Sequence, residues 1–132
     1  MKRGKKKLGK SKKLTIPRLR DKVWMRFSIF IRSRGSVNGY NKCTTCGDVK
    51  LISELQAGHF MHGKNKSTYF DERNVHPQCP RCNNWLSGNL IKYTRFMQDE
   101  YGDCVIDELE EKHLKLHIWK RQDLEELYGR YK

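Results

Sequence analysis

The chain has 132 residues, 36% hydrophobic and 33% charged, with a net charge of +13 at pH 7. This length allows one compact domain with a modest apolar core, and the longest apolar run is too short for a membrane-spanning helix. The first residues lack the apolar stretch of a secretory signal, so we expect an intracellular protein.

The positive charge is concentrated in the first quarter of the chain. Residues 1–34 contain 14 Lys or Arg and one acidic residue, whereas residues 35–132 contain 14 of each kind. A basic segment suits a polyanion because each phosphate that it neutralises releases condensed counterions. The alternative is a tail that only aids solubility or localisation.

We expect residues 1–16 to be a disordered basic arm that binds nucleic acid and residues 17–132 to form a single domain. The residues of the arm that we predict to contact phosphate are Lys5, Lys6, Lys7, Lys10, Lys12 and Lys13.

An amphipathic helix is predicted over about residues 19–33. Leu19, Val23 and Phe27 recur at helical spacing, so this stripe should pack on the rest of the domain. The basic residues around the stripe either extend the phosphate-binding surface or form a solvated face. Those assigned to nucleic-acid binding are Arg18, Arg20 and Arg26.

Two Cys-x-x-Cys pairs, Cys43/Cys46 and Cys79/Cys82, are separated by 32 residues. In a reducing compartment such pairs favour a metal over disulfides. Four thiolates close a tetrahedral zinc site with no open position for water, so the predicted zinc is structural and contributes about 10 kcal/mol to folding. The fifth cysteine, Cys104, has no partner at ligand spacing and is expected to be a small buried residue.

A strand that ends at His59 and a polar basic loop over residues 63–68 are predicted between the pairs. Lys64 and Lys66 of this loop are predicted phosphate contacts. His62 is a further phosphate contact or, equally, a surface residue. The second cysteine pair is expected at the start of a helix.

Packing helices are predicted over about residues 90–131, where apolar residues again recur at helical spacing. The three segments are residues 90–101, 107–119 and 122–128.

Three residues, two of them close to the Cys79/Cys82 pair, are predicted to hydrolyse a phosphodiester together. His59 is largely neutral at pH 7 and can act as the general base. Asn83 directly follows the last cysteine and offers an amide oxygen to a hard catalytic cation, Mg²⁺ or Mn²⁺. Asn74 can hydrogen-bond the backbone around His59 and fix the imidazole. We expect the ring of His59 and the amide of Asn83 to face the same DNA strand.

This pattern resembles the HNH (ββα-metal, treble-clef) nucleases, among which the phage recombination endonuclease VII group has the same four-cysteine framework. It is more similar to the NinG family of lambdoid phages, the family of the recombination protein Rap. The resemblance covers about residues 17–131, and its most specific stretches are residues 56–60, 71–83 and 86–89.

The resemblance implies a small zinc-stabilised α+β fold with a treble-clef ββα-metal core, flanking α-helices and a disordered basic arm. It implies a metal-dependent, structure-selective DNA endonuclease in the cytoplasm of a phage-infected bacterium, acting on Holliday junctions, D-loops or other DNA with branches or single strands. His59 then matches the general base, Asn74 the central asparagine and Asn83 the cation ligand. Two opposed cuts would suit a homodimer formed by the late helices.

One position departs from the HNH pattern. Junction-resolving enzymes of this type usually have an aspartate before the base, and here that residue is Gly58. Asp71, Glu72 or Glu54 replaces it from nearby, or the cation relies on Asn83, water and phosphate.

Two other functions fit parts of the sequence. One is a non-catalytic zinc-knuckle DNA-binding accessory protein of recombination, and the other is a regulator that binds a protein partner through its acidic C-terminal helices. Only the nuclease needs His59 and Asn83 together. No small-molecule cofactor and no membrane partner are expected.

Overall fold

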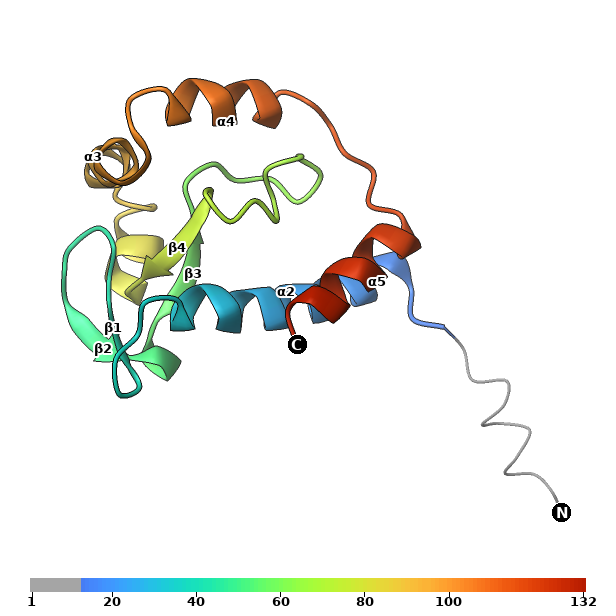
Figure 1. The fold of residues 1–132 in the computed structure, drawn as a ribbon, viewed down its shortest axis with the longest axis horizontal. Helices are drawn as coiled ribbons and strands as arrows, with labels where there is room; N and C mark the ends of the chain where they lie inside the picture. The colour runs from blue at the N-terminus through green and yellow to red at the C-terminus, as the bar shows by residue number, and fades with distance from the viewer. Residues whose placement is uncertain (1–12) are drawn as a thin grey trace, which may run out of the picture.

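The structure is a computed structural model that describes residues 13–132. Within these residues, an α-helix, two short hairpins and three further α-helices follow one another (Figure 1). This arrangement confirms the expected small α+β fold. The predicted contacts Lys5, Lys6, Lys7, Lys10 and Lys12 lie outside the described residues. Within residues 13–132, no helix has both the length and the apolar character needed to cross a membrane.

The first helix, α2 (Ile16–Ser33), begins three residues before the predicted start. The Thr15 side chain accepts a hydrogen bond from the Arg18 backbone N–H at 3.3 Å, and Pro17 lies in the first turn, where its missing N–H costs nothing. The predicted stripe is buried, and its members are Leu19, Val23, Phe27 and Ile31.

Both sheets are two-stranded antiparallel hairpins. The first pairs β1 (Tyr40–Lys42) with β2 (Val49–Leu51), and the first cysteine pair lies in the segment that joins these strands. The second pairs β3 (Gln56–His59) with β4 (Val75–Gln78). The predicted strand that ends at His59 is therefore confirmed.

The β3–β4 hairpin lies between two pairs of helices (Figure 1). On one side α2 packs against α5 (Arg121–Arg130), and on the other α3 (Leu90–Tyr101) packs against α4 (Val105–His113). The stripes of α3 and α4 face each other through Tyr93, Met97, Val105 and Leu109. Because these side chains are buried within the chain, they are not available for the expected homodimer.

The predicted helix over residues 107–119 is wrong at its C-terminal end. Helix α4 ends at His113, and the following segment forms a bridge to Lys66 instead of another turn. Leu114, Leu116 and Ile118 of this segment are exposed, so no apolar surface holds a longer helix against the core.

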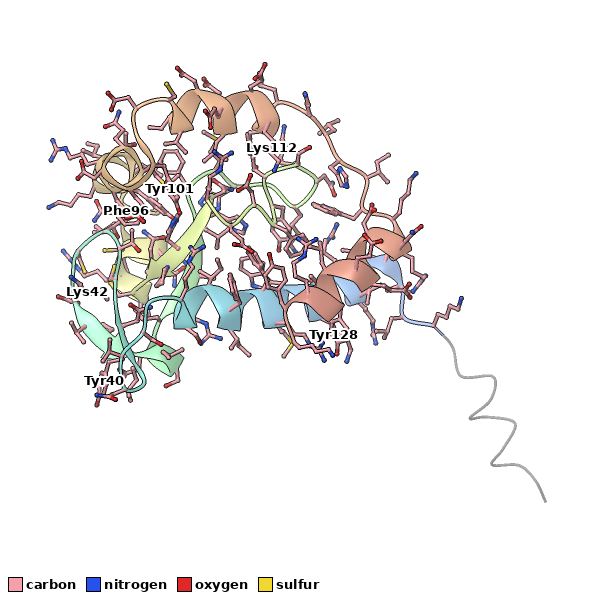
Figure 2. The ribbon with its side chains drawn as sticks, viewed as in Figure 1. Tyr40, Lys42, Phe96, Tyr101, Lys112 and Tyr128 are labelled. Atoms are coloured by element: carbon pink, nitrogen blue, oxygen red, sulfur yellow. The ribbon has the colours of Figure 1, made fainter. Side chains whose placement is uncertain are left out.

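Two further predictions are corrected by side-chain contacts. The Arg26 guanidinium lies 3.5 Å from the ring centroid of Tyr128 and donates to the Tyr128 carbonyl at 2.8 Å (Figure 2 labels Tyr128 on α5). Arg26 therefore joins α2 to α5 and is not a free phosphate contact. Cys104 is exposed, because Val105 and Leu109 supply the buried face of α4.

Candidate functional site

The four predicted cysteine ligands form one cluster. Their sulfur atoms all lie within 4.8 Å of one another, and Cys46 Sγ is 3.8 Å from Cys79 Sγ. A tetrahedral zinc ion with Zn–S bonds of about 2.3 Å separates its sulfur ligands by about 3.8 Å. Cys43, Cys79 and Cys82 are buried, whereas Cys46 is exposed. The cluster can therefore hold a zinc ion that is closed to substrate.

Hydrogen-bond donors around the sulfurs favour thiolates in part of the cluster. Burial raises the pKa of Cys43, but the Thr45 hydroxyl and nearby backbone N–H groups outweigh burial and lower this pKa to about 6. The Asn89 side-chain amide donates to Cys82 Sγ at 3.5 Å. Burial raises the pKa of Cys46 to about 12. A bound dication would hold Cys46 as a thiolate as well, since metal binding displaces thiol protons.

His59, the last residue of β3, has one fixed tautomer. Its Nε2 donates to the Tyr69 carbonyl at 3.0 Å, because a carbonyl oxygen can only accept. The lone pair of the neutral ring is then on Nδ1. This nitrogen has no partner among residues 13–132, and it is not one of the enclosed unpaired polar atoms, so it is not fully enclosed.

Two aromatic rings pack against the imidazole and against each other, with the centroids of Trp24 and Tyr69 5.3 Å apart. The centroids of Trp24 and Tyr69 each lie 4.9 Å from that of His59, with the ring planes within 15° of parallel. Only 8% of His59 is exposed, and this burial lowers its pKa to about 4, against the raising effect of the Tyr69 carbonyl. The imidazole is therefore neutral at physiological pH and able to accept a proton.

Asn74 makes the expected contacts with the backbone near His59. It is fully buried; its Oδ1 accepts the Met61 N–H at 2.9 Å, and its Nδ2 donates to the carbonyls of Met61 at 2.9 Å and Thr68 at 3.1 Å. These three bonds tie Asn74, at the end of the segment between β3 and β4, to Met61 near its start and to Thr68 in its middle. The Tyr69 carbonyl, directly after Thr68, is thereby held beside the ring of His59.

A second buried histidine fixes the other side of the hairpin. Tyr101 donates to His76 Nε2 at 2.7 Å, His76 Nδ1 donates to the Tyr93 hydroxyl at 3.1 Å, and Tyr93 donates to the Gly58 carbonyl at 2.7 Å. Burial lowers the pKa of His76 to about 3, so this relay is neutral. Figure 2 labels Tyr101 on α3, the helix that the relay connects to the hairpin.

Asn83 lies in a short π-helical turn (Arg81–Trp85) and is half-buried. Its Nδ2 donates to Gln56 Oε1 at 2.7 Å, and its Oδ1 is 3.0 Å from the position that a Cβ on Gly58 would take. Successive side chains of a strand point to opposite faces, so Asn83 lies on the face of Gly58 and His59 on the face of α2. The expectation that His59 and Asn83 face the same side is therefore wrong.

The carboxylates considered for the cation are engaged elsewhere. Asp71 Oδ2 accepts from Lys112 Nζ at 2.7 Å, and Glu72 Oε2 accepts from the Tyr131 hydroxyl at 2.6 Å (Figure 2 labels Lys112). Glu54 accepts a backbone N–H in its own turn. Asp71 and Glu72 lie in the segment that joins β3 to β4, and each is already bonded to a residue of a C-terminal helix or its end. They do not replace the missing aspartate.

One predicted phosphate contact lies near His59, and others lie where α2 meets the loop over residues 63–68. The ring centroid of His62 lies 5.8 Å from that of His59, and Arg20 Nη1 donates to Asn65 Oδ1 at 3.4 Å. This contact brings α2 beside the loop that carries Lys64 and Lys66. The remaining two, Lys13 and Arg18, are exposed near the start of α2.

Two residues that shape this site have no clear signal in the sequence. Trp24 stacks on His59 but lies one position off the apolar stripe of α2, so helical periodicity does not single it out. Gln78 is the last residue of β4, directly before Cys79, and is completely buried. Its burial depends on the pairing of β4 with β3, which no local pattern predicts.

The buried His59 predicts a loss of stability in acid. Its folded-state pKa of about 4 lies below the 6.5 of the free side chain, so the unfolded chain binds a proton first as the pH falls. This side chain's contribution is therefore complete above pH 6.5 and is lost on acidification. We expect acidification from pH 7 to pH 5 to lower the free energy of unfolding by about 2 kcal/mol through His59.

Urea unfolding of the wild type and of His59→Gln at both pH values measures this contribution. The variant should lose about 2 kcal/mol less than the wild type, because zinc release in acid affects both proteins equally. The exposed His62→Gln variant is the control and should behave like the wild type. An identical pH dependence in His59→Gln would contradict the assignment.

Comparison with known proteins places the chain in a family. A family model described as "Bacteriophage Lambda NinG protein" matches residues 2–132. The chain belongs to the NinG family. The predicted membership of the NinG family is thereby confirmed.

Individual NinG proteins match part of the chain. The protein ninG of Salmonella phage P22 is 33% identical over 90 residues, which are 67% of this chain and 43% of the relative. Those of Escherichia phages lambda and 933W are 31% and 32% identical over 90 residues, again 67% of this chain, and 43% and 44% of the relatives. The match thus spans less than half the length of these NinG proteins. No solved structure matches the chain.

Proposed function

We propose that this NinG-family chain is a metal-dependent, structure-selective DNA endonuclease of the HNH type, with a treble-clef core, that cuts branched recombination intermediates such as Holliday junctions and D-loops. The observation that carries the proposal is the state of His59. Its imidazole is neutral, its proton is held on Nε2 by the Tyr69 carbonyl, and its Nδ1 lone pair is not fully enclosed.

His59 acts as the general base in this proposal. Its Nδ1 takes a proton from a water molecule, and the resulting hydroxide attacks the phosphorus while the bond to the leaving oxygen breaks. Asn74 has a positioning role, since its three backbone bonds hold the Tyr69 carbonyl that sets the tautomer of His59. The four cysteines hold structural zinc, because a closed thiolate shell leaves no position for water.

A divalent cation, Mg²⁺ or Mn²⁺, would neutralise charge on the phosphate and on the leaving oxygen, and the Asn83 amide oxygen is a suitable ligand. In an in-line displacement the attacking and leaving oxygens lie on opposite sides of the phosphorus. Because His59 and Asn83 lie on opposite faces of β3, this proposal requires the phosphate to lie across the edge of the strand. The basic residues where α2 meets the loop over residues 63–68, Arg20 and Lys64 among them, would hold the flanking phosphates.

A non-catalytic zinc-knuckle DNA-binding protein is the alternative function. The small exposed fraction of His59 and its stacking on Trp24 favour this alternative, since both also stabilise a purely structural histidine. Both functions require the cysteine cluster and the basic arm, so neither feature separates them.

A cleavage assay on several DNA structures tests the proposed function. Four-way junction, D-loop, flap and linear duplex are each incubated with the protein in Mg²⁺, Mn²⁺ or EDTA. We expect cleavage of the branched substrates in either metal, little cleavage of linear duplex and none in EDTA. Binding without cleavage under every condition would instead support the alternative.

Deleting residues 1–13 should weaken junction binding and reduce its dependence on salt. This segment carries eight Lys or Arg residues, and each phosphate contact that is lost should reduce the slope of log K against log [salt] by about 0.9. Fluorescence anisotropy over a range of salt concentrations measures both effects. A charge-conserving variant, Lys5→Arg with Lys6→Arg and Lys7→Arg, should keep the wild-type slope. Unchanged affinity of the deletion variant at every salt concentration would exclude a role for the arm.

A further inference from the structure

A buried amide oxygen has no partner beside Asn83. Gln78 is completely buried, and its Nε2 donates to Thr45 Oγ1 at 3.1 Å and to the Gly88 carbonyl at 2.9 Å. Its Oε1 is enclosed and accepts no hydrogen bond. Leaving a buried acceptor unpaired costs free energy, so an unpaired oxygen in this position requires an explanation.

The orientation of this amide is determined by its neighbours. The Gly88 carbonyl can only accept, so the nitrogen of Gln78 must face it. Rotating the amide by 180° would bring two oxygens together and lose the bond to Gly88. The oxygen of Gln78 is therefore directed away from Gly88.

Gln78 and Asn83 direct their oxygens at the same small space. A Cβ on Gly58 would overlap Gln78 Oε1 and would lie 3.0 Å from Asn83 Oδ1. Asn83 is oriented in the same way as Gln78, because its Nδ2 donates to Gln56 Oε1 at 2.7 Å. Both oxygens thus lie on the side of β3 where a side chain at residue 58 would project, and because residue 58 is glycine, Gln78 Oε1 occupies part of that volume.

We infer that Gln78 Oε1 and Asn83 Oδ1 are two protein ligands of the divalent cation, with Gln78 in the place of a carboxylate at residue 58. The inference deepens the proposed function and rests on it. Mg²⁺ and Mn²⁺ prefer oxygen donors, and side-chain amide oxygens are among them. Two neutral ligands hold a cation weakly, so water and the DNA phosphate would complete the shell from the side of the half-buried Asn83, and affinity rises when DNA is bound.

The cysteine cluster helps to position Gln78. The Thr45 hydroxyl lies 3.4 Å from Cys43 Sγ and accepts from Gln78 Nε2 at 3.1 Å. Zinc bound by the cysteines would hold Thr45, and through it the amide of Gln78. The structural metal thus supports the second site without taking part in its chemistry.

Mn²⁺ binding to the zinc-loaded protein tests the inference without relying on activity. Electron paramagnetic resonance measures the affinity, and the anomalous scattering of Mn²⁺ in crystals locates the ion. We expect a single weak site between residues 78 and 83 in the wild type. Gln78→Met preserves volume but removes the oxygen, and it should weaken Mn²⁺ binding at least tenfold at unchanged zinc content.

Moving the oxygen ligand from residue 78 on β4 to residue 58 on β3 tests whether Gln78 acts as a ligand or only through packing. In Gly58→Asp alone, the new side chain overlaps Gln78, so Mn²⁺ binding should not improve. In Gly58→Asp with Gln78→Ala, the carboxylate occupies the vacated space and Mn²⁺ should bind more tightly than to the wild type. Rescue by the double variant would show that residue 78 contributes an oxygen ligand and not only packing.

The outcomes separate this inference from the proposed function. Equal Mn²⁺ affinity in the wild type and Gln78→Met, or no Mn²⁺ density beside Gln78 Oε1 at millimolar Mn²⁺, would overturn the inference even if the wild type cuts junctions. Mn²⁺ bound at Gln78 in a protein that cuts no DNA would leave the cation site standing and overturn the proposed nuclease.

Discussion

Replacing His59 with alanine is expected to slow junction cleavage by at least about 100-fold, the usual contribution of general-base catalysis, while junction affinity changes less than about threefold. The reason is that Nδ1 of His59 takes the proton from the attacking water, whereas phosphate binding depends on the predicted basic contacts. Single-turnover cleavage at saturating protein measures the rate, and fluorescence anisotropy in EDTA measures the affinity.

Two further variants control for the packing of the ring. His59→Gln keeps most of the side-chain volume beside Trp24 and Tyr69, and it should lose cleavage as fully as His59→Ala while unfolding at nearly the wild-type temperature. His62→Ala removes the neighbouring exposed histidine and should retain most of the cleavage rate. Parallel loss of binding and cleavage in His59→Gln would favour the non-catalytic alternative, and an unchanged rate would exclude His59 as the base.

Replacing Cys82 with serine is expected to release the zinc and unfold the centre of the domain. A structural zinc site contributes about 10 kcal/mol, which is comparable to the whole stability of a small domain. Cys82 is fully buried, so the serine hydroxyl would also face a site lined by the remaining thiols. Zinc content by atomic absorption and thermal unfolding by circular dichroism measure the two effects.

Cys104→Ser is the matched control for this experiment. Cys104 is exposed and lies outside the cysteine cluster, so its replacement should change neither zinc content nor unfolding temperature. A Cys82→Ser protein with full zinc content and wild-type stability would contradict the four-cysteine site. The effects of the two metals should also differ: omitting Mg²⁺ and Mn²⁺ should stop cleavage reversibly, whereas zinc loss should be accompanied by unfolding.

Local patterns predicted the elements of this fold well where packing follows the period of a helix. The buried residues of α2 are those of the predicted stripe, from Leu19 to Ile31, and α3 ends at Tyr101, before Gly102, as its pattern indicates. The prediction failed beyond His113, because periodic residues form a helix only where another element covers their apolar face. There, Leu116 is exposed.

Motif spacing and helical periodicity are properties of neighbouring residues, and they were enough to predict the family, the four cysteine ligands and helix α2. The contacts of each polar side chain depend instead on how distant segments pack. Antiparallel pairing of β3 with β4 separates His59 from Asn83, buries Gln78 beside Gly58, and leaves Asp71 with Lys112. These outcomes depend on which face of a strand meets which distant segment, and that is set by packing across the whole chain.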